Sequence, residues 1–309
     1  MIRSIALVAI FVLIAGCQQE KPAPTATTPE PAPTATQPAK AAPIVLSEGF
    51  STPESVLYDA EKDVYYVSNI NGSPVEQDGN GYISRVNPET LAVEAKWIEG
   101  GRNSAQLGAP KGMAIVGDEL WVSDITFIRK FDRKTGAWKS SVTIPGATFL
   151  NDMAADGSNV YVSDSGMKME GGNFVGTNTD AVWSLAGAQP KRFAAAMNLN
   201  RPNGLAVSGG KLWAVSFAGS ELYDITDGKK GQVTTLPAGS LDGLVPIPDG
   251  SFLVSSWDAK TVFRGTPGGT FQPVVQNVES PADIGFDSKR SRILIPHFTE
   301  NRVSIHPLE

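Results

Sequence analysis

The chain repeats one pattern six times: a polar residue, a short apolar run, a tight turn and a second apolar run. The clearest copy has the apolar runs Met113-Ala-Ile-Val116 and Leu120-Trp-Val122, separated by a turn at Gly117-Asp118. The other copies begin at Pro53, Leu150, Pro202, Leu241 and Pro281. Short apolar runs bounded by turn residues predict β-strands, and their repetition predicts a repeat architecture.

The interval between copies indicates which repeat architecture this is. Most copies start about 40 residues apart, a period typical of β-propellers with four strands in each blade. Helical repeats of similar length do not fit, because no segment shows apolar residues at helical spacing. The chain also contains 31 Gly and 22 Pro, which interrupt it throughout. We therefore predict an all-β fold, a six-bladed β-propeller.

Two intervals are longer than the others because they contain insertions, at residues 69–81 and 166–180. Both insertions follow the second strand of their copy, so both are expected on the same face of the propeller.

The last copy is short, with three predicted strands at 283–287, 292–297 and 301–306. A lone predicted strand, 43–47, precedes the first copy. Because proteins normally cover an open sheet edge, we expect this strand to complete the sixth blade and close the ring. A closed ring has no free edge to pair, so we expect a monomer.

The first 42 residues have the composition of a targeting segment and a linker. Arg3 precedes an apolar run, 5–14, that is too short to span a bilayer and has the length of a signal peptide. The run ends in Ile14-Ala-Gly-Cys17, which resembles the lipidation box of bacterial lipoproteins, and Cys17 is the single cysteine of the chain. An ordinary secretory signal followed by a chance cysteine is the alternative.

We therefore predict a signal peptide at 1–16, a Pro-, Ala- and Thr-rich disordered tether at 17–42, and the propeller at 43–309. Lipidation of Cys17 would make the membrane contact through a lipid anchor alone. Because Gln18 rather than Asp follows the cysteine, the predicted location is the outer membrane of the cell envelope, facing the periplasm.

Overall composition excludes some classes of partner and site. The formal net charge is -6 and Lys and Arg do not cluster, which argues against nucleic acid as a partner. The chain has two His residues, which leaves little material for a His-based zinc site. The apolar residues, 41% of the chain, suffice for a large core.

Polar residues at the start of the repeats are candidates for a common site. The first strand of each propeller blade lines the central channel, so the six residues just before these strands should surround one axis. We call these the channel residues: Glu54, Lys111, Asn151, Asn203, Asp242 and Ala282. Four of them carry carboxylate or carboxamide oxygens, which suit one hard divalent cation. Ca²⁺ fits best, with Mg²⁺, Mn²⁺ or Zn²⁺ as alternatives.

The residue types at these positions also fit two roles that need no cation. Lys111 could act as an internal counter-ion for the carboxylates. Asn, Asp and Gly also form good turns, so their presence at the start of a strand can be purely structural.

The motifs Thr52-Pro-Glu-Ser55, Leu150-Asn-Asp152, Pro202-Asn-Gly204 and Leu241-Asp-Gly243 resemble those of the SMP-30/gluconolactonase/LRE-like family. The resemblance extends from about Ser47 to the C-terminus. It implies a six-bladed propeller with one divalent cation in the channel. The implied cation ligands are Glu54, Asn203 and Asp242, and Asn151 would be a fourth ligand or a substrate contact.

The resemblance also implies an activity, hydrolysis of a lactone or ester, with Asp242 as the catalytic base. Sugar lactonases of the family carry Arg just before the Asn of the third blade, whereas this chain has Phe149-Leu150. This difference favours a ligand other than a sugar acid, and a more apolar one. Lys111 is an unusual charge beside a cation, and we expect it to contact the substrate.

Two functions from different classes follow from the sequence. One is a metal-dependent hydrolase of a small-molecule lactone or ester. The other is a non-catalytic propeller of the cell envelope that binds a ligand or a protein, an interpretation favoured by the predicted lipid anchor and long tether.

Overall fold

The computed structural model describes residues 16, 42–157, 159–185, 189–195 and 197–308. Cys17 and nearly all of the predicted signal peptide and tether lie outside the described residues. Within them the chain is built of β-strands and one 3-10 helix, η1 (Met197–Leu199). No helix in the described part of the chain is long and apolar enough to cross a membrane.

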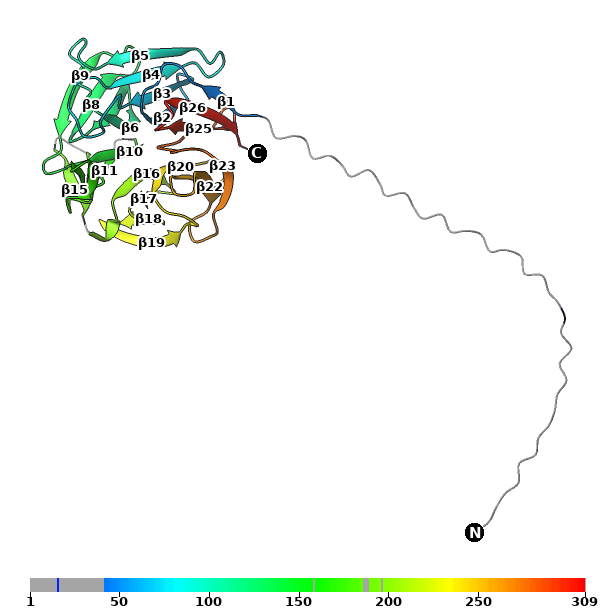
Figure 1. Ribbon diagram of the computed structural model, residues 1–309. Helices are drawn as coiled ribbons and strands as arrows, with labels where there is room; N and C mark the ends of the chain where they lie inside the picture. The colour runs from blue at the N-terminus through cyan, green and yellow to red at the C-terminus, as the bar shows by residue number, and fades with distance from the viewer. Residues whose placement is uncertain (1–15, 17–41, 158, 186–188, 196, 309) are drawn as a thin grey trace. The chain divides into compact units, whose positions relative to one another are not determined.

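Six four-stranded antiparallel sheets form the blades of a propeller (Figure 1). Blade 1 consists of β2 (Pro53–Asp59), β3 (Val64–Asn69), β4 (Tyr82–Val86) and β5 (Val93–Glu99). Blade 2 consists of β6 (Pro110–Val116), β7 (Glu119–Asp124), β8 (Phe127–Asp132) and β9 (Trp138–Thr143). Blade 3 consists of β10 (Leu150–Asp156), β11 (Asn159–Asp164), β14 (Ala181–Ser184) and β15 (Lys191–Ala195).

The other three blades have the same order of strands. Blade 4 consists of β16 (Pro202–Ser208), β17 (Lys211–Ser216), β18 (Glu221–Thr226) and β19 (Lys229–Thr235). Blade 5 consists of β20 (Leu241–Pro246), β21 (Phe252–Ser256), β22 (Thr261–Gly265) and β23 (Gln272–Gln276). Blade 6 consists of β24 (Gly285–Asp287), β25 (Arg292–His297), β26 (Arg302–Pro307) and β1 (Ile44–Leu46).

The hydrophobic core lies between neighbouring blades. Trp121 of blade 2, for example, packs in one cluster with Met153 and Trp183 of blade 3. Equivalent clusters fill the other five junctions, because the apolar residues of each strand face the next sheet. The aromatic residue that recurs in the second strand of most copies is part of these clusters.

The ring closes as predicted, through the strand that precedes the first copy. β1 pairs with β26 in antiparallel register, with Ile44 opposite Ile305 and Leu46 opposite Val303. Ile44 and Leu46 also pack against the core between blades 6 and 1. The predicted fold class, a six-bladed propeller completed by its N-terminal strand, is therefore confirmed.

Deleting residues 43–47 should lower the free energy of unfolding by roughly 2–5 kcal/mol, because the pairing of β1 and the burial of Ile44 and Leu46 are lost. Thermal melting measures the effect. Deletion of residues 30–34, within the predicted tether, is the control and should leave the melting temperature unchanged. Equal melting temperatures for the two deletions would contradict a stabilising role of the closing strand.

Blades 6 and 1 are also joined along their inner strands. The first strand of blade 6 is shorter than predicted, because Asp283 pairs with blade 1 instead. Its N–H donates to the carbonyl of Glu54, and its carbonyl accepts from the N–H of Val56. The first and last blades are therefore joined at the channel as well as through the turns and the core between them.

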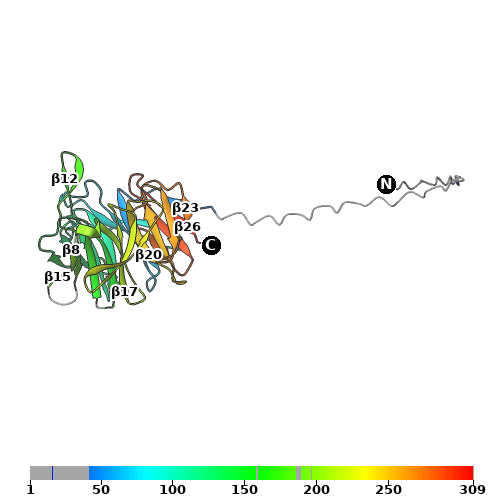
Figure 2. The ribbon, with the colours of Figure 1, turned by 90° about the horizontal axis from the view of Figure 1, so that it is seen from below.

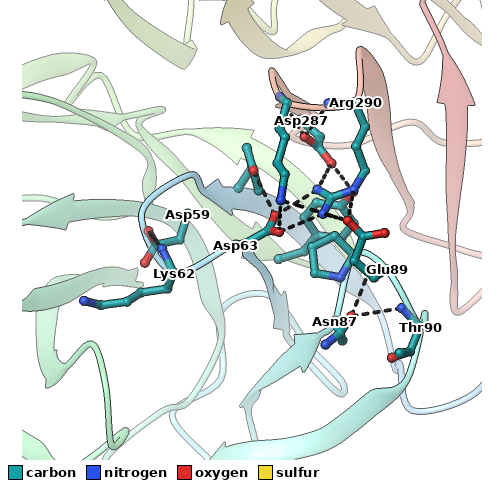
Figure 3. Close-up of polar contacts among 12 residues, drawn as sticks. Asp59, Lys62, Asp63, Asn87, Glu89, Thr90, Asp287 and Arg290 are labelled. Atoms are coloured by element: carbon teal, nitrogen blue, oxygen red, sulfur yellow. Dashed lines mark hydrogen bonds and ion pairs between the residues drawn. The ribbon is translucent and has the colours of Figure 1, made fainter.

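An ion-pair network joins the same two blades through their turns (Figure 3). The guanidinium of Arg290, which follows β24, contacts Asp63 in the β2–β3 turn at 2.7 Å and Glu89 in the β4–β5 turn at 2.5 Å. It also contacts Asp287 of its own blade at 2.9 Å. These turns lie at the opposite end of the inner strands from Glu54, so the network joins blades 6 and 1 on the face opposite the candidate site.

The two insertions lie where they were expected, after the second strands of blades 1 and 3. The second insertion contains a hairpin of β12 (Met167–Glu170) and β13 (Asn173–Gly176), which projects from one face of the propeller (Figure 2). Residues 70–81 of the first insertion form no strand. Both insertions contribute to the walls of the candidate site.

Candidate functional site

The channel residues of blades 1 to 5 lie at irregularities in the inner strands. Each is the second residue of its strand, rather than the residue before it as the sequence suggested. In each of these blades the pairing register shifts at this point, as between Pro110 and Met113 of β6. A β-bulge redirects the side chain of the extra residue, and here it allows the side chain to point into the channel.

Buried serines of the second strands hold these bulges. The hydroxyl of Ser163 accepts from the N–H of Asp152 in its own blade and donates at 2.8 Å to the carbonyl of Asn203 in the next blade. Ser255 likewise accepts from Gly243 and donates at 2.8 Å to the carbonyl of Ala282. The recurring serine of the repeat therefore couples the channel residues Asn151, Asn203 and Ala282 to the blade before each of them.

Glycines follow three of the channel residues because the inner strands approach closely there. A Cβ atom at Gly204 would collide with the carbonyl oxygen of Asp242, and one at Gly243 would collide with the backbone of Ile284. The motifs Asn203-Gly204 and Asp242-Gly243 thus have a packing reason in the channel, and they are not the tight hairpin turns that such pairs often form.

A cavity of about 270 Å³ opens at the channel end formed by these bulges. The structure brings all five polar channel residues into its lining: Glu54, Lys111, Asn151, Asn203 and Asp242. Ala282, the sixth position, contributes the carbonyl that accepts from Ser255. The predicted site residues are therefore assembled in one place, although they come from five different blades.

Hydrogen bonds fix three of these side chains. The indole N–H of Trp257 donates to Asp242 Oδ2 at 2.7 Å, and the amide of Asn151 donates to the Ser165 hydroxyl at 3.2 Å. The ammonium of Lys111 donates to the carbonyls of Pro74 at 3.0 Å and Ala109 at 3.1 Å. Lys111 is 1% exposed, so these carbonyls replace most of its water.

Three buried side-chain oxygens of the site have no hydrogen-bond partner: Glu54 Oε2, Asn203 Oδ1 and Asp242 Oδ1. Buried polar atoms are almost always bonded, and a group of unbonded oxygens converging on one cavity indicates an absent partner. These three residues are those that the family resemblance implies as cation ligands. Two carboxylates and one carboxamide oxygen are a suitable donor set for Ca²⁺.

The donor set mixes carboxylate and carboxamide oxygens. In the described part of the chain, no group of three or more Asp, Glu, His or Cys side chains is arranged to hold a metal. A cation at this position would therefore depend on carboxamide oxygens as well as on Glu54 and Asp242. The residues present fit a hard divalent cation, with Asn151 adjacent in the lining.

The electrostatics of the cavity favour a positive ligand. Burial raises the pKa of Glu54 well above its usual value, and Asp242 and Asp283 raise it further. Burial, with the Asp283 carboxylate, raises the pKa of Asp242 to about 8. Burial lowers the pKa of Lys111 to about 8, although Glu54 and Asp124 oppose this shift. The Lys111 ammonium therefore does not bring the pKa values of Glu54 and Asp242 back to their ordinary range.

A second layer of carboxylates below the channel residues was not identified from the sequence. Asp152 and Asp283 follow Asn151 and Ala282 directly, and both are buried. Asp152 accepts from the N–H groups of Met153 and Leu205, and Asp283 accepts from the Ser55 hydroxyl. Burial raises the pKa of Asp283 to about 6 and also raises that of Asp152, with Asp283 contributing.

These shifts predict that the metal-free protein loses stability as the pH rises. A carboxyl whose pKa is raised by folding holds its proton to a higher pH in the folded protein than in the unfolded chain. Its contribution to stability is therefore complete below the unfolded pKa of about 4, and it is lost as the pH rises through the folded-state pKa. Because the pKa of Asp242 is about 8, the stability should fall from about pH 4 to about pH 8. Thermal melting in EDTA should show this decline, and millimolar Ca²⁺ should raise the melting temperature more at about pH 8 than at about pH 5. A calcium effect that is larger at low pH would contradict this.

The walls of the cavity are apolar and come from a second set of equivalent positions. The residue that follows the second strand of each blade lies above the channel residues, and in four blades it lines the cavity: Ile70, Phe217, Trp257 and Phe298. In blades 1, 4, 5 and 6 its N–H donates to the carbonyl two residues before the channel residue, as from Phe217 to Arg201. This position could have been found in the sequence by aligning the copies one residue beyond the second strand.

Two further parts of the chain complete the walls. Phe149 precedes β10 and packs edge-on against Phe174 of the β12–β13 hairpin, with ring centroids 5.7 Å apart. Met167 of β12 and Pro74 of the first insertion also line the cavity. The ammonium of Lys111 lies 4.5 Å from the centre of the Phe149 ring, in the geometry of a cation–π contact.

Comparisons with known proteins identify the fold. No protein-family model matches the chain, and no curated protein matches it in sequence. Among solved structures, a luciferin-regenerating enzyme matches with a TM-score of 0.62 and 15% identity, over 86% of this chain and 96% of that one. A catalytically inactive virginiamycin B lyase from Staphylococcus aureus with quinupristin matches with a TM-score of 0.59 and 14% identity, over 87% and 99%.

A nidogen/laminin complex also matches, with a TM-score of 0.57 and 15% identity, over 70% of this chain and 76% of that chain. The chain is thus similar to propellers of several kinds, enzymes among them. At these identities the likeness shows the six-bladed propeller fold alone.

Proposed function

We propose that this protein is a divalent-cation-dependent hydrolase of a lactone or ester, of the SMP-30/gluconolactonase-like type. The observation that carries the proposal is the convergence of three unbonded buried oxygens, from Glu54, Asn203 and Asp242, on one cavity. Ca²⁺ is the proposed cation, and Mg²⁺, Mn²⁺ or Zn²⁺ are the alternatives. The proposed substrate is a small molecule that enters the cavity.

A bound divalent cation would supply a Lewis acid that polarises the carbonyl of the substrate and stabilises negative charge on its oxygen. Glu54, Asn203 and Asp242 would hold it, and Asn151 would be a fourth ligand or a substrate contact. The ammonium of Lys111 is held within 3.1 Å of two carbonyls, so it can keep its position when a substrate binds. Lys111 is therefore proposed to contact the substrate at the edge of the site.

Asp242 is the proposed base. Its Oδ2 is held by the indole of Trp257 at 2.7 Å, which orients the carboxylate toward the cavity. The carboxylate would take a proton from water while the water oxygen bonds to the carbonyl carbon. The bond from that carbon to the alkoxy oxygen then breaks, and the alkoxy group receives the proton. The products are a carboxylic acid and an alcohol, joined in one molecule when the substrate is a lactone.

The test is to measure metal content and hydrolysis together. The purified protein should contain or bind one divalent cation per chain, and a panel of lactones and esters should include substrates whose hydrolysis stops in EDTA and returns with Ca²⁺. Calcium binding without hydrolysis of any panel member would instead support the alternative of a non-catalytic ligand-binding propeller. Failure to bind any divalent cation would contradict both the ligand set and the enzyme.

We also propose that Cys17 carries a lipid that anchors the protein in the outer membrane, facing the periplasm. Cys17→Ser should move the protein from the membrane fraction to the soluble fraction, because the lipid is the proposed membrane contact. Gln18→Asp is the matched control, which should keep the protein in membranes but move it to the inner membrane. A membrane-bound Cys17→Ser protein would contradict lipid anchoring at this residue.

A further inference from the structure

The walls and the floor of the candidate site differ in chemistry, and this difference defines what the site can accept. The floor consists of the polar channel residues, whereas the wall side chains are apolar. Among the wall side chains, the indole N–H of Trp257 is the one strong hydrogen-bond donor, and it already donates to Asp242. A substrate group that rests against these walls therefore finds no side-chain partner for a hydroxyl.

Aromatic rings make up much of the wall, in two groups. Phe217, Trp257 and Phe298 form a continuous series from blades 4 to 6, with ring centroids 6.1 Å and 5.3 Å apart. Phe149 and Phe174 form the second group from blade 3. Aromatic rings favour edge-to-face or offset packing with another ring, so the two groups offer suitable surfaces for a planar aromatic guest.

The exposure of these rings indicates that the wall is made for a ligand rather than for the core. Phe217, Trp257 and Phe298 are half-buried, and Phe174 is 42% exposed although it lines the cavity. In a monomeric protein, apolar side chains gathered at a cavity mouth mark a binding site. Phe174 belongs to the β12–β13 hairpin, which is outside the six blade sheets, and it adds an apolar side chain to the cavity lining.

We propose that the site takes a neutral ester or lactone carrying an aromatic group, and that it discriminates against polyhydroxylated substrates. The inference rests on the proposed hydrolase for the carbonyl at the floor, and it adds the class of group that the walls bind. A negatively charged substituent is disfavoured, because the apolar wall side chains offer it no partner in place of water and Lys111 is already bonded to two carbonyls. The cavity of about 270 Å³ is slightly smaller than sites for drug-sized ligands, which suits a small aromatic molecule.

The test compares two acetate esters of primary alcohols, benzyl acetate and glycerol monoacetate, with the calcium-loaded full chain. Their reacting groups are alike, so the comparison reports on the wall. Each unpaired hydroxyl should reduce kcat/KM by roughly tenfold or more, and benzyl acetate should be preferred by at least about tenfold. Calorimetry with two amides that resist hydrolysis, N-benzylacetamide and N-(2,3-dihydroxypropyl)acetamide, measures the same preference without turnover.

Variants locate the preference in the wall. Phe217→Ser and Phe298→Ser should each reduce the preference for the benzyl compounds by roughly fivefold or more, because apolar area is lost where the ring would rest. Phe193→Ser is the control. Phe193 lies in β15, is half-buried against Tyr161, and is outside the cavity lining. Phe298→Leu should retain part of the preference, and melting temperatures confirm that each variant is folded.

The outcomes separate this inference from the proposed function. Binding of N-(2,3-dihydroxypropyl)acetamide that equals or exceeds that of N-benzylacetamide overturns the aromatic preference, whether or not hydrolysis is observed. Hydrolysis that favours glycerol monoacetate overturns it too, and leaves the hydrolase in place. Tighter binding of N-benzylacetamide, without hydrolysis of either ester or of any member of the lactone and ester panel, supports the aromatic site and removes the proposed activity.

Discussion

Asp242→Asn is expected to lower kcat/KM for ester or lactone hydrolysis by about a hundred- to ten-thousandfold, the usual contribution of a positioned general base. The amide cannot take a proton from water, but its oxygen can still accept from the Trp257 indole, which now holds Asp242 at 2.7 Å. The site should therefore keep its shape. Steady-state kinetics at saturating Ca²⁺ measure the loss, and the melting temperature shows that the fold is intact.

Asp283→Asn provides the matched control for Asp242→Asn. Asp283 is also a buried carboxylate with a raised pKa, but it is not part of the cavity lining and already accepts from Ser55. Its replacement should leave hydrolysis within a few-fold of the parent. Similar losses in the two variants would mean that Asp242 acts through the charge of the channel rather than as the base.

Glu54→Gln is expected to change stability in opposite directions with and without calcium. In EDTA at about pH 8 the variant should be more stable than the parent, on the order of 1–3 kcal/mol, because a neutral amide removes a buried carboxyl whose pKa is raised. In millimolar Ca²⁺ the order should reverse, since loss of one ligand charge should weaken binding by enough to outweigh this gain, about a hundredfold or more. Thermal melting with and without Ca²⁺ measures both effects.

The same control separates charge relief from loss of a ligand. Asp283→Asn should also raise the stability of the metal-free protein, because it removes a carboxyl with a raised pKa, but it should keep the calcium-induced rise in melting temperature. If Glu54→Gln keeps the full calcium effect, Glu54 is not a cation ligand and the ligand set must be revised.

The fold and the polar floor of the site could be predicted because both follow from the repeat. The same position in each copy has to lie around one axis, which places Glu54, Asn203 and Asp242 together. The closing strand followed from the number of strands in the last copy. Each prediction used symmetry, which a single sequence with internal repeats displays directly.

The walls of the site were missed because they depend on where strands end. Phe217, Trp257 and Phe298 come just after a strand, where the repeat pattern is weakest, although they too occupy equivalent positions. Phe174 could not be placed at all, since the conformation of an insertion is independent of the repeat. The apolar preference predicted from the sequence rested on Phe149, and the structure adds the rest of the surface.

Asp152 and Asp283 were missed for a different reason. Each follows a channel residue directly, and in a regular strand the next side chain would point away from the channel face. The register shift in β10 removes this alternation, so Asp152 approaches the channel as well. Bulges are not visible in an alternation pattern, and so the second layer of carboxylates could be seen in the structure alone.

The closure of the ring by β1 also determines when the site can form during synthesis. Glu54 is made early and Asp242 nearly two hundred residues later, while Ile44 finds its partner Ile305 close to the end of the chain. A nascent chain that ends before Asn203 therefore carries one of the three proposed ligands. Contacts so distant in sequence form slowly. The proposed cation site would therefore be completed late, after Asp242 has been synthesised and β1 has closed the ring.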